Sequence, residues 1–85
     1  MFELTENKLI MKVDNEEVGY IIYSKQEDHY VGTYVFVDPI HRGKGYADQL
    51  VAKFVEMATE ENMKIVPVCH VINRKLNEKY PEMIK

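Results

Sequence analysis

RGKGYA, residues 42–47, joins a β-rich run that contains a proline to a long amphipathic segment. Glycine lacks the Cβ atom that would keep a ligand away from the backbone. The first turn of a helix offers unpaired N–H groups at the positive end of the helix dipole. The stretch therefore predicts a loop whose backbone N–H groups bind a diphosphate. The alternative is an ordinary glycine-rich start of a helix that binds no ligand.

The residues before this stretch predict three consecutive strands. Lys8–Val13 and Val18–Tyr23 alternate around the turn-forming residues 14–17, which is typical of a β-hairpin. His29–Val37 is the third predicted strand, and Asp38-Pro39 ends it because proline lacks the N–H that a ladder needs. The three strands predict an antiparallel meander. In the third strand we expect one face to hold Val31, Thr33, Val35 and Val37.

The residues after the stretch predict a helix, a strand and a second helix. Apolar residues recur at intervals of three and four from Ala47 to Ala58, which predicts an amphipathic helix of about four turns that packs on one face of the sheet. Lys64–Val71 is the fourth predicted strand, and its Pro67 marks an edge, a bulge or a point where this strand parts from its neighbour. Asn73–Tyr80 predicts a short helix with Asn73 as its N-cap, stopped by Pro81.

The composition bounds the class of protein. The 85 residues, 46% of them hydrophobic and 29% charged, predict a single soluble domain over residues 1–85. A net charge of −3 argues against general nucleic-acid binding. No apolar run approaches the roughly 20 residues of a membrane span, and the start lacks the pattern of a signal peptide. One cysteine cannot form an internal disulfide, so we expect a cytoplasmic protein.

The arrangement of strand, Arg-x-x-Gly-x-Ala loop, helix and strand resembles the GNAT superfamily of acyl-CoA-dependent N-acetyltransferases. The resemblance includes residues 35–39 before the loop and Leu50-Val51 after it. Pro67-Val68-Cys69 also resembles a small single-domain branch of these acetyltransferases that carries a Pro-x-Cys segment on the next strand. The resemblance implies a GNAT-like α+β fold, with a three-stranded meander, an amphipathic helix, a splayed fourth strand and a short C-terminal helix.

The resemblance also implies a site for acetyl-CoA. The backbone of the cofactor strand would pair with the pantetheine arm, and the loop would bind the diphosphate, with charge added by Arg42 and Lys44. A segment of larger members, Asn-x-x-Ala-x-x-x-Tyr, resembles residues 73–80 and implies that Asn73 contacts the pantetheine. The implied cofactor-binding residues are Phe36, Val37, Arg42, Gly43, Lys44, Gly45, Tyr46, Ala47 and Asn73.

Two residues have implied catalytic roles. Cys69 stands where the branch places a catalytic cysteine, and it could accept the acetyl group as a thiolate or donate a proton as a thiol. Tyr80 would protonate the departing thiolate. Each residue also has a structural alternative, because a lone cysteine often serves as a small buried hydrophobe and Tyr80 could simply pack.

The function that follows is the transfer of an acetyl group from acetyl-CoA to an unidentified acceptor, expected to be an amine. A coenzyme A binding module without turnover and a small protein-interaction domain are the alternatives. The three histidines lack partners at ligand spacing, so no metal site is predicted. We expect a monomer or a weak homodimer, whose partner subunit could complete an open site.

Overall fold

Five strands form one sheet in the order β1, β2, β3, β4, β5, and a second helix near the end of the chain packs beside the first. The computed structural model describes all 85 residues. The strands are β1 (Phe2–Leu4), β2 (Lys8–Val13), β3 (Glu16–Lys25), β4 (His29–Val37) and β5 (Lys64–Pro67). The helices are α1 (Tyr46–Glu60) and α2 (His70–Lys79), and single 3₁₀ turns lie at Pro39–His41 and Pro81–Met83. Neither helix is long and apolar enough to cross a membrane.

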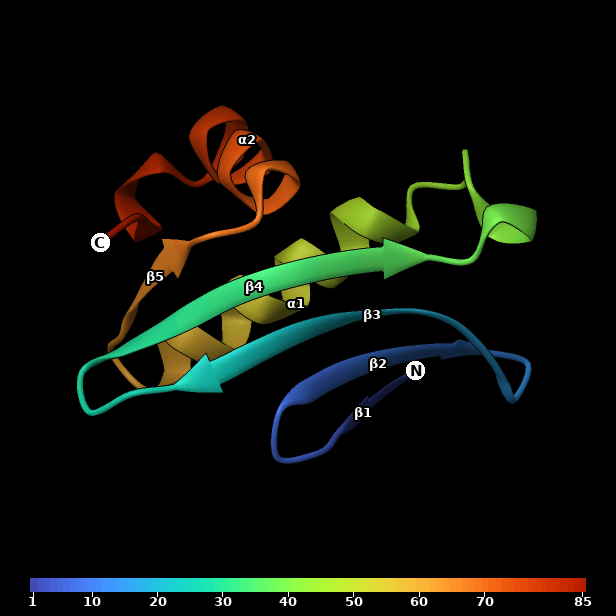
Figure 1. Cartoon of the computed structure of the whole chain (residues 1–85), viewed down its shortest axis with the longest axis horizontal. Coiled ribbons are helices and arrows are strands. Elements are labelled where there is room, and N and C mark those ends of the chain that lie inside the picture. The colour runs from blue at the N-terminus through green and yellow to red at the C-terminus, as the bar shows by residue number, and fades with distance from the viewer.

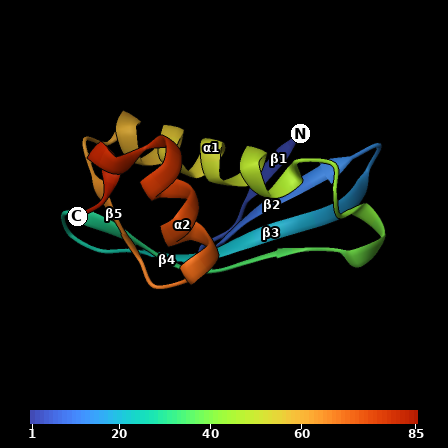
Figure 2. The same cartoon turned by 90° about the horizontal axis from the view of Figure 1, so that it is seen from above.

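The fold has two layers, as Figures 1 and 2 show. Strands β1 to β4 pair antiparallel with their neighbours in sequence, whereas β4 and β5 pair parallel through the crossover helix α1. The predicted meander is therefore confirmed. It has one strand more than predicted, because β1 is too short for its alternation to be recognised in the sequence.

The turn between β2 and β3 is the tight hairpin that the sequence predicts. Asp14 and Asn15 both have positive φ, 52° and 66°, which is the backbone that a two-residue hairpin of this twist requires. Strand β3 begins at Glu16, two residues before the predicted start at Val18.

A β-bulge changes which side chains of β4 face the helices. The register of β3 and β4 shifts between Ile22 and Tyr23, so that Thr33 is the extra residue. Before the bulge, Tyr30 is buried beneath the helices, and after it Val35 and Val37 pack against the core. The predicted common face of Val31, Thr33, Val35 and Val37 is therefore wrong, because a bulge resets a period of two.

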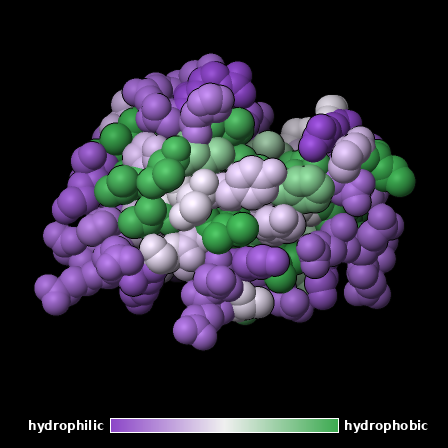
Figure 3. Space-filling model, in the orientation of Figure 1, coloured by the Kyte–Doolittle hydropathy of each residue, from purple (hydrophilic) through white to green (hydrophobic).

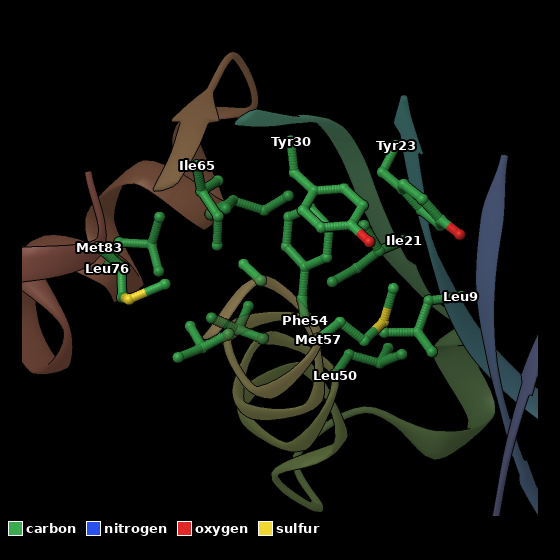
Figure 4. Close-up of a cluster of buried hydrophobic side chains, with 14 of the residues drawn as sticks. Leu9, Ile21, Tyr23, Tyr30, Leu50, Phe54, Met57, Ile65, Leu76 and Met83 are labelled. Carbon is green, nitrogen blue, oxygen red and sulfur yellow. The ribbon is translucent and has the colours of Figure 1, made fainter. Parts of the chain in front are cut away.

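The core lies between the sheet and the two helices. Leu50, Phe54 and Ala58 of α1 are fully buried against the sheet, and Ile72 and Leu76 of α2 are fully buried beside them. Figure 4 shows Phe54 below Tyr30, with Leu9 and Ile21 of the sheet close by. Apolar side chains at helical spacing thus fix α1 where the sequence predicts it.

The end of the chain differs from the prediction. Strand β5 stops at Pro67, after which the N–H groups of Val68 and Cys69 both donate to the carbonyl of Gly32, at 2.9 and 3.1 Å. The predicted strand as far as Val71 is therefore wrong. Helix α2 begins at His70 with Cys69 as its N-cap. Asn73 lies inside the helix, so its predicted role as the N-cap is also wrong.

Both helices cover the same face of the sheet, and the other face is open (Figure 2). Tyr20 lies opposite Phe36 on this open face, with ring centroids 5.3 Å apart, and Ile22 lies opposite Tyr34 in the next row. Figure 3 shows this side of the molecule with apolar side chains in the middle and hydrophilic ones around them.

Candidate functional site

The loop between β4 and α1 owes its shape to two glycines. Gly43 and Gly45 have φ of 81° and 79°, a left-handed backbone that other residues adopt only with strain. A Cβ atom at either position would meet nothing within 4 Å, so the backbone conformation and not a lack of space calls for glycine.

Helix α1 begins directly after this loop with an uncapped first turn. Gly45 is its N-cap and provides no side chain to bind the free N–H groups. The N–H groups of Tyr46, Ala47 and Asp48 lack intrahelical partners by the geometry of a helix start. Unpaired N–H groups at the positive end of a helix dipole favour an anion.

A shallow hollow of about 220 Å³ lies over this helix start. Its lining comes from the end of β4, the loop, the first turn of α1 and one residue of α2. The lining residues are Val37, His41, Arg42, Gly43, Gly45, Tyr46, Ala47, Asp48 and Lys75. Six of the nine predicted cofactor-binding residues thus line one hollow, whereas Phe36, Lys44 and Asn73 do not.

Arg42 is held at the end of β4 with its charge uncompensated. Its Nε donates to the carbonyl of Val37 at 3.0 Å, and its guanidinium carbon lies 6.0 Å from the ring centroid of Phe36. Arg42 forms no ion pair with any carboxylate. Its remaining N–H groups are therefore available to an anion in the hollow.

His41 fixes the loop to the turn between β2 and β3. Its Nε2 lies 2.8 Å from Oε2 of Glu16, and its ring lies 6.3 Å from that of Tyr46. Because Glu16 occupies that nitrogen, His41 serves as an anchor of the loop in this structure.

Asp48 joins the start of α1 to α2. Nζ of Lys75 donates to its Oδ1 at 2.6 Å, and Nζ of Lys79 lies 4.0 Å from its Oδ2. The hydrogen bond from Lys75, together with the positive charges of Lys75, Lys79 and Arg74, holds the pKa of Asp48 below its usual value. The carboxylate therefore stays ionised beside the hollow.

Strand β4 has an unpaired edge next to the hollow. Pairing with β5 ends at Gly32 opposite Pro67, and beyond that point β4 has a partner only in β3. Of the alternatives predicted for Pro67, an edge, a bulge or a point where the strand parts from its neighbour, the last describes this end of the ladder. The open edge is where an extended ligand could pair with the backbone.

The alternation of β4 decides which backbone groups face this open edge. The N–H of Asp38 donates to Val18 of β3, so Phe36 and Tyr34 also direct their backbone groups toward β3. Val35 and Val37 then face the open edge, as the bond from Arg42 to the carbonyl of Val37 agrees. The backbone groups of Phe36, a predicted cofactor contact, thus face β3 in this register, whereas those of Val35 face the open edge.

Cys69 lies where β5 ends and α2 begins. Its thiol-bearing side chain is half-buried and packs at the margin of the core. Its N–H donates to Gly32, and its carbonyl accepts from the N–H of Asn73 at 2.9 Å. Cys69 is therefore fixed by its backbone beside the last paired residue of β4.

Asn73 and Tyr80 lie farther along α2 than Cys69. Asn73 is exposed, accepts a hydrogen bond from Asn77 at 3.0 Å, and lines a separate hollow of about 410 Å³ with His70, Val71 and Arg74. Tyr80 is half-buried at the opposite end of α2 from Cys69. Because a ten-residue helix is about 15 Å long, the structure does not bring Cys69 and Tyr80 together.

A family model described as GCN5-related N-acetyl-transferase matches residues 8–85. No match was found among curated proteins.

Solved structures of acetyltransferases share the fold. A GCN5-like protein from Staphylococcus aureus is 23% identical with a TM-score of 0.77, and the match covers 100% of this chain and 87% of that one. A ribosomal-protein-alanine N-acetyltransferase from Brucella melitensis biovar Abortus 2308 is 23% identical with a TM-score of 0.69, covering 92% of this chain and 60% of that one. A predicted acetyltransferase from Clostridium acetobutylicum, solved with acetyl-CoA, is 19% identical with a TM-score of 0.64, covering 86% and 55%. The chain thus spans little more than half the length of the last two proteins.

Proposed function

Because the chain belongs to the GCN5-related N-acetyltransferase family, we propose that it transfers an acetyl group from acetyl-CoA to an amine. The observation that carries the proposal is the uncapped start of α1 beneath a hollow, directly beside the unpaired edge of β4. One end of this arrangement suits a diphosphate and the other suits a chain of amides, and acetyl-CoA contains both.

The diphosphate would lie in the hollow. The N–H groups at the start of α1 donate to its oxygens, and Arg42 adds a charge-assisted hydrogen bond. Gly43 and Gly45 give the loop the conformation that leaves these groups open. Lys44, which lies outside the hollow, contributes its charge at a longer range.

The pantetheine arm would run along the open edge of β4. Val35 and Val37 direct backbone donors and acceptors to that edge, so the amides of the arm would add to β4 as an extra strand does. Following β4 from Val37 back toward Gly32 brings the thioester to the place where Pro67 and Cys69 leave the sheet.

In the reaction, the amine nitrogen attacks the carbonyl carbon of the thioester. A C–N bond forms, the C–S bond breaks, and coenzyme A leaves as a thiolate that takes up a proton, while the amine loses one. The thiol of Cys69 would donate the proton to the departing thiolate, and the proton lost by the amine would pass through water to restore that thiol. In the alternative route, Cys69 as a thiolate accepts the acetyl group first and passes it to the amine. Tyr80, at the other end of α2, is the alternative to Cys69 as the proton donor.

Titration of acetyl-CoA into ¹⁵N-labelled protein tests the binding proposal. We expect shifts at the amides of residues 43–48 and at Val35 and Val37, with no comparable change at Leu9 and Ile10, which lie in β2 on the far side of β3 from the open edge. Absence of shifts in the loop would contradict the proposal.

Radiolabelled acetyl-CoA with a mixture of primary amines tests turnover. We expect acetylated amine with the wild-type protein and at least a tenfold lower rate with Cys69→Ala. Label retained on Cys69 in the absence of an amine would support the two-step route. Binding without any transfer would instead support the alternative, a coenzyme A binding module.

A further inference from the structure

The hollow over the start of α1 has one wall that the loop does not provide. Lys75 is the only lining residue from α2, and 27 positions separate it from Asp48, its partner in the hollow. Its side chain is 17% exposed, which is low for a lysine, and its ammonium group is paired with Asp48 beside the hollow.

Asp48 orients Lys75 without neutralising this part of the surface. One of the three N–H donors of Lys75 is used by Asp48, and two remain. Asp48 is also within 4.0 Å of Lys79, so one carboxylate is shared by two ammonium groups. With Arg42 unpaired on the other side of the loop, the hollow carries an excess of positive charge on a chain whose net charge is −3.

We propose that Lys75 is a phosphate-binding residue, whose ammonium group donates from α2 to the diphosphate of acetyl-CoA while Arg42 and the first turn of α1 bind it from the loop. This inference rests on the proposed function. It assigns the cofactor site a residue that lies outside the loop, at a position that the Asn-x-x-Ala-x-x-x-Tyr segment leaves unspecified.

The position of Lys75 gives the contact a second consequence. Lys75 lies on α2, the helix whose N-cap is Cys69, and its ion pair with Asp48 joins α2 to α1 near the hollow. A diphosphate bound by Lys75 therefore connects the phosphate end of the cofactor to the element that presents Cys69. The two ends of acetyl-CoA would be held by one helix.

The test compares the affinity of acetyl-CoA for the wild-type protein and for Lys75→Gln by calorimetry. Loss of one charge-assisted hydrogen bond is expected to weaken binding about tenfold. Lys53→Gln is the matched control, because it removes the same charge from an ion pair on α1 that does not line the hollow. We expect Lys53→Gln to change the affinity less than twofold.

Asp48→Asn separates phosphate binding from a merely structural role of the ion pair. If Lys75 acts only by holding α2 to α1, Asp48→Asn should weaken acetyl-CoA binding as much as Lys75→Gln does. If Lys75 binds phosphate, Asp48→Asn should bind acetyl-CoA as tightly as wild type or more tightly, because it removes a negative charge beside the diphosphate. Equal weakening in both variants would overturn the inference.

Shortened ligands identify the phosphate that is bound. We expect Lys75→Gln to weaken binding of 3′-dephospho-acetyl-CoA by the same factor as that of acetyl-CoA, and to leave the amide shifts caused by S-acetylpantetheine unchanged. A loss seen only when the 3′-phosphate is present would overturn the diphosphate assignment. If the wild-type protein and Lys75→Gln bind acetyl-CoA with the same affinity, the inference about Lys75 is overturned and the proposed function stands. If the wild-type protein does not bind acetyl-CoA, the proposed function is overturned as well.

Discussion

Single residues set the geometry of the loop and the stability of the far end of the sheet. Gly45 provides a left-handed backbone immediately before α1, and the hydroxyl of the buried Tyr30 donates to Glu61 at the other end of that helix. One residue serves the proposed site and the other serves the core, and each can be tested separately.

Replacement of Gly45 by alanine is expected to lower the free energy of unfolding by about 1 kcal/mol, because φ at this position is 79° and a Cβ atom makes that backbone unfavourable. Gly45→Asn is the control, since asparagine tolerates the left-handed region and can cap a helix. Urea denaturation should place Gly45→Asn between wild type and Gly45→Ala. Equal losses in the two variants would contradict the conformational explanation.

Tyr30 should make the protein sensitive to alkaline pH. Burial, with the hydrogen bond to Glu61 and its charge, raises the pKa of the Tyr30 hydroxyl above that of an unfolded tyrosine, which is about 10. The unfolded chain therefore loses this proton first as the pH rises above 10, and the stability of the folded state falls. Below that pH the contribution is fully present.

The variant Tyr30→Phe should lose about 1 kcal/mol at neutral pH, with the hydrogen bond to Glu61. Its stability should then decline less than that of wild type when urea denaturation is repeated at about pH 10.5. Some decline should remain, because burial also raises the pKa of Tyr23. Parallel declines in wild type and Tyr30→Phe would exclude Tyr30 as the source.

At the scale of elements, the close contact between β4 and both helices depends on Gly32. A Cβ atom on Gly32 would lie 3.0 Å from Cε2 of Phe54 and 3.1 Å from Cδ1 of Ile72. This glycine lets α1 and α2 approach the same point of the sheet. Its carbonyl also accepts hydrogen bonds from the N–H groups of Val68 and Cys69.

Gly32→Ala should destabilise the protein by about 1–3 kcal/mol through overpacking. Valine lacks the Cδ1 atom that the new methyl group would meet on Ile72, so Ile72→Val should restore part of the loss in the double variant. A double-mutant cycle measured by urea denaturation gives this coupling directly. Strict additivity of the two losses would show that the contact with Ile72 is not the cause.

The elements that the sequence predicts well are those with a clear period or a clear turn. The apolar period of α1 and the hairpin at Asp14 and Asn15 are confirmed, and the parting of the strands at Pro67 is one of the alternatives predicted there. The predicted boundary between β5 and α2 was wrong. The β-branched residues of 65–71 favour a strand locally, but the burial of Ile72 and Leu76 against the core stabilises a helix from His70 onward.

In the candidate site too, residues that are close in the sequence could be predicted, whereas a residue brought there only by tertiary packing could not. Residues 42–47 are contiguous, so their cluster follows from the sequence alone. Lys75 could not be found in this way, because only the packing of α2 against α1 brings it to Asp48. The direction of the backbone groups of Phe36 also depends on the pairing of β3 with β4, which the sequence does not show.

At the scale of the whole molecule, the sheet combines two kinds of connection. Strands β1 to β4 follow one another through short turns, whereas β5 reaches β4 only after the loop and α1 have been traversed. The β4–β5 ladder runs only from His29 opposite Lys64 to Gly32 opposite Pro67, and it is much shorter than the ladder between β3 and β4.

This crossover has a consequence for the order of folding. Closing a long loop costs entropy before its contacts repay it, so the hairpins should form in the folding transition state and the β4–β5 ladder after it. Ile21→Val in β3 and Ile65→Val in β5 delete the same methylene group from fully buried side chains, and each should cost about 1 kcal/mol.

Stopped-flow kinetics should separate these two variants. Ile21→Val should mainly slow folding, and Ile65→Val should mainly speed unfolding. Faster unfolding of Ile21→Val with slower folding of Ile65→Val would reverse the order. If the order holds, the edge of β4 beside Pro67 is the last part of the molecule to be completed, and a ligand lying along it would lengthen the lifetime of the folded state without hastening its formation.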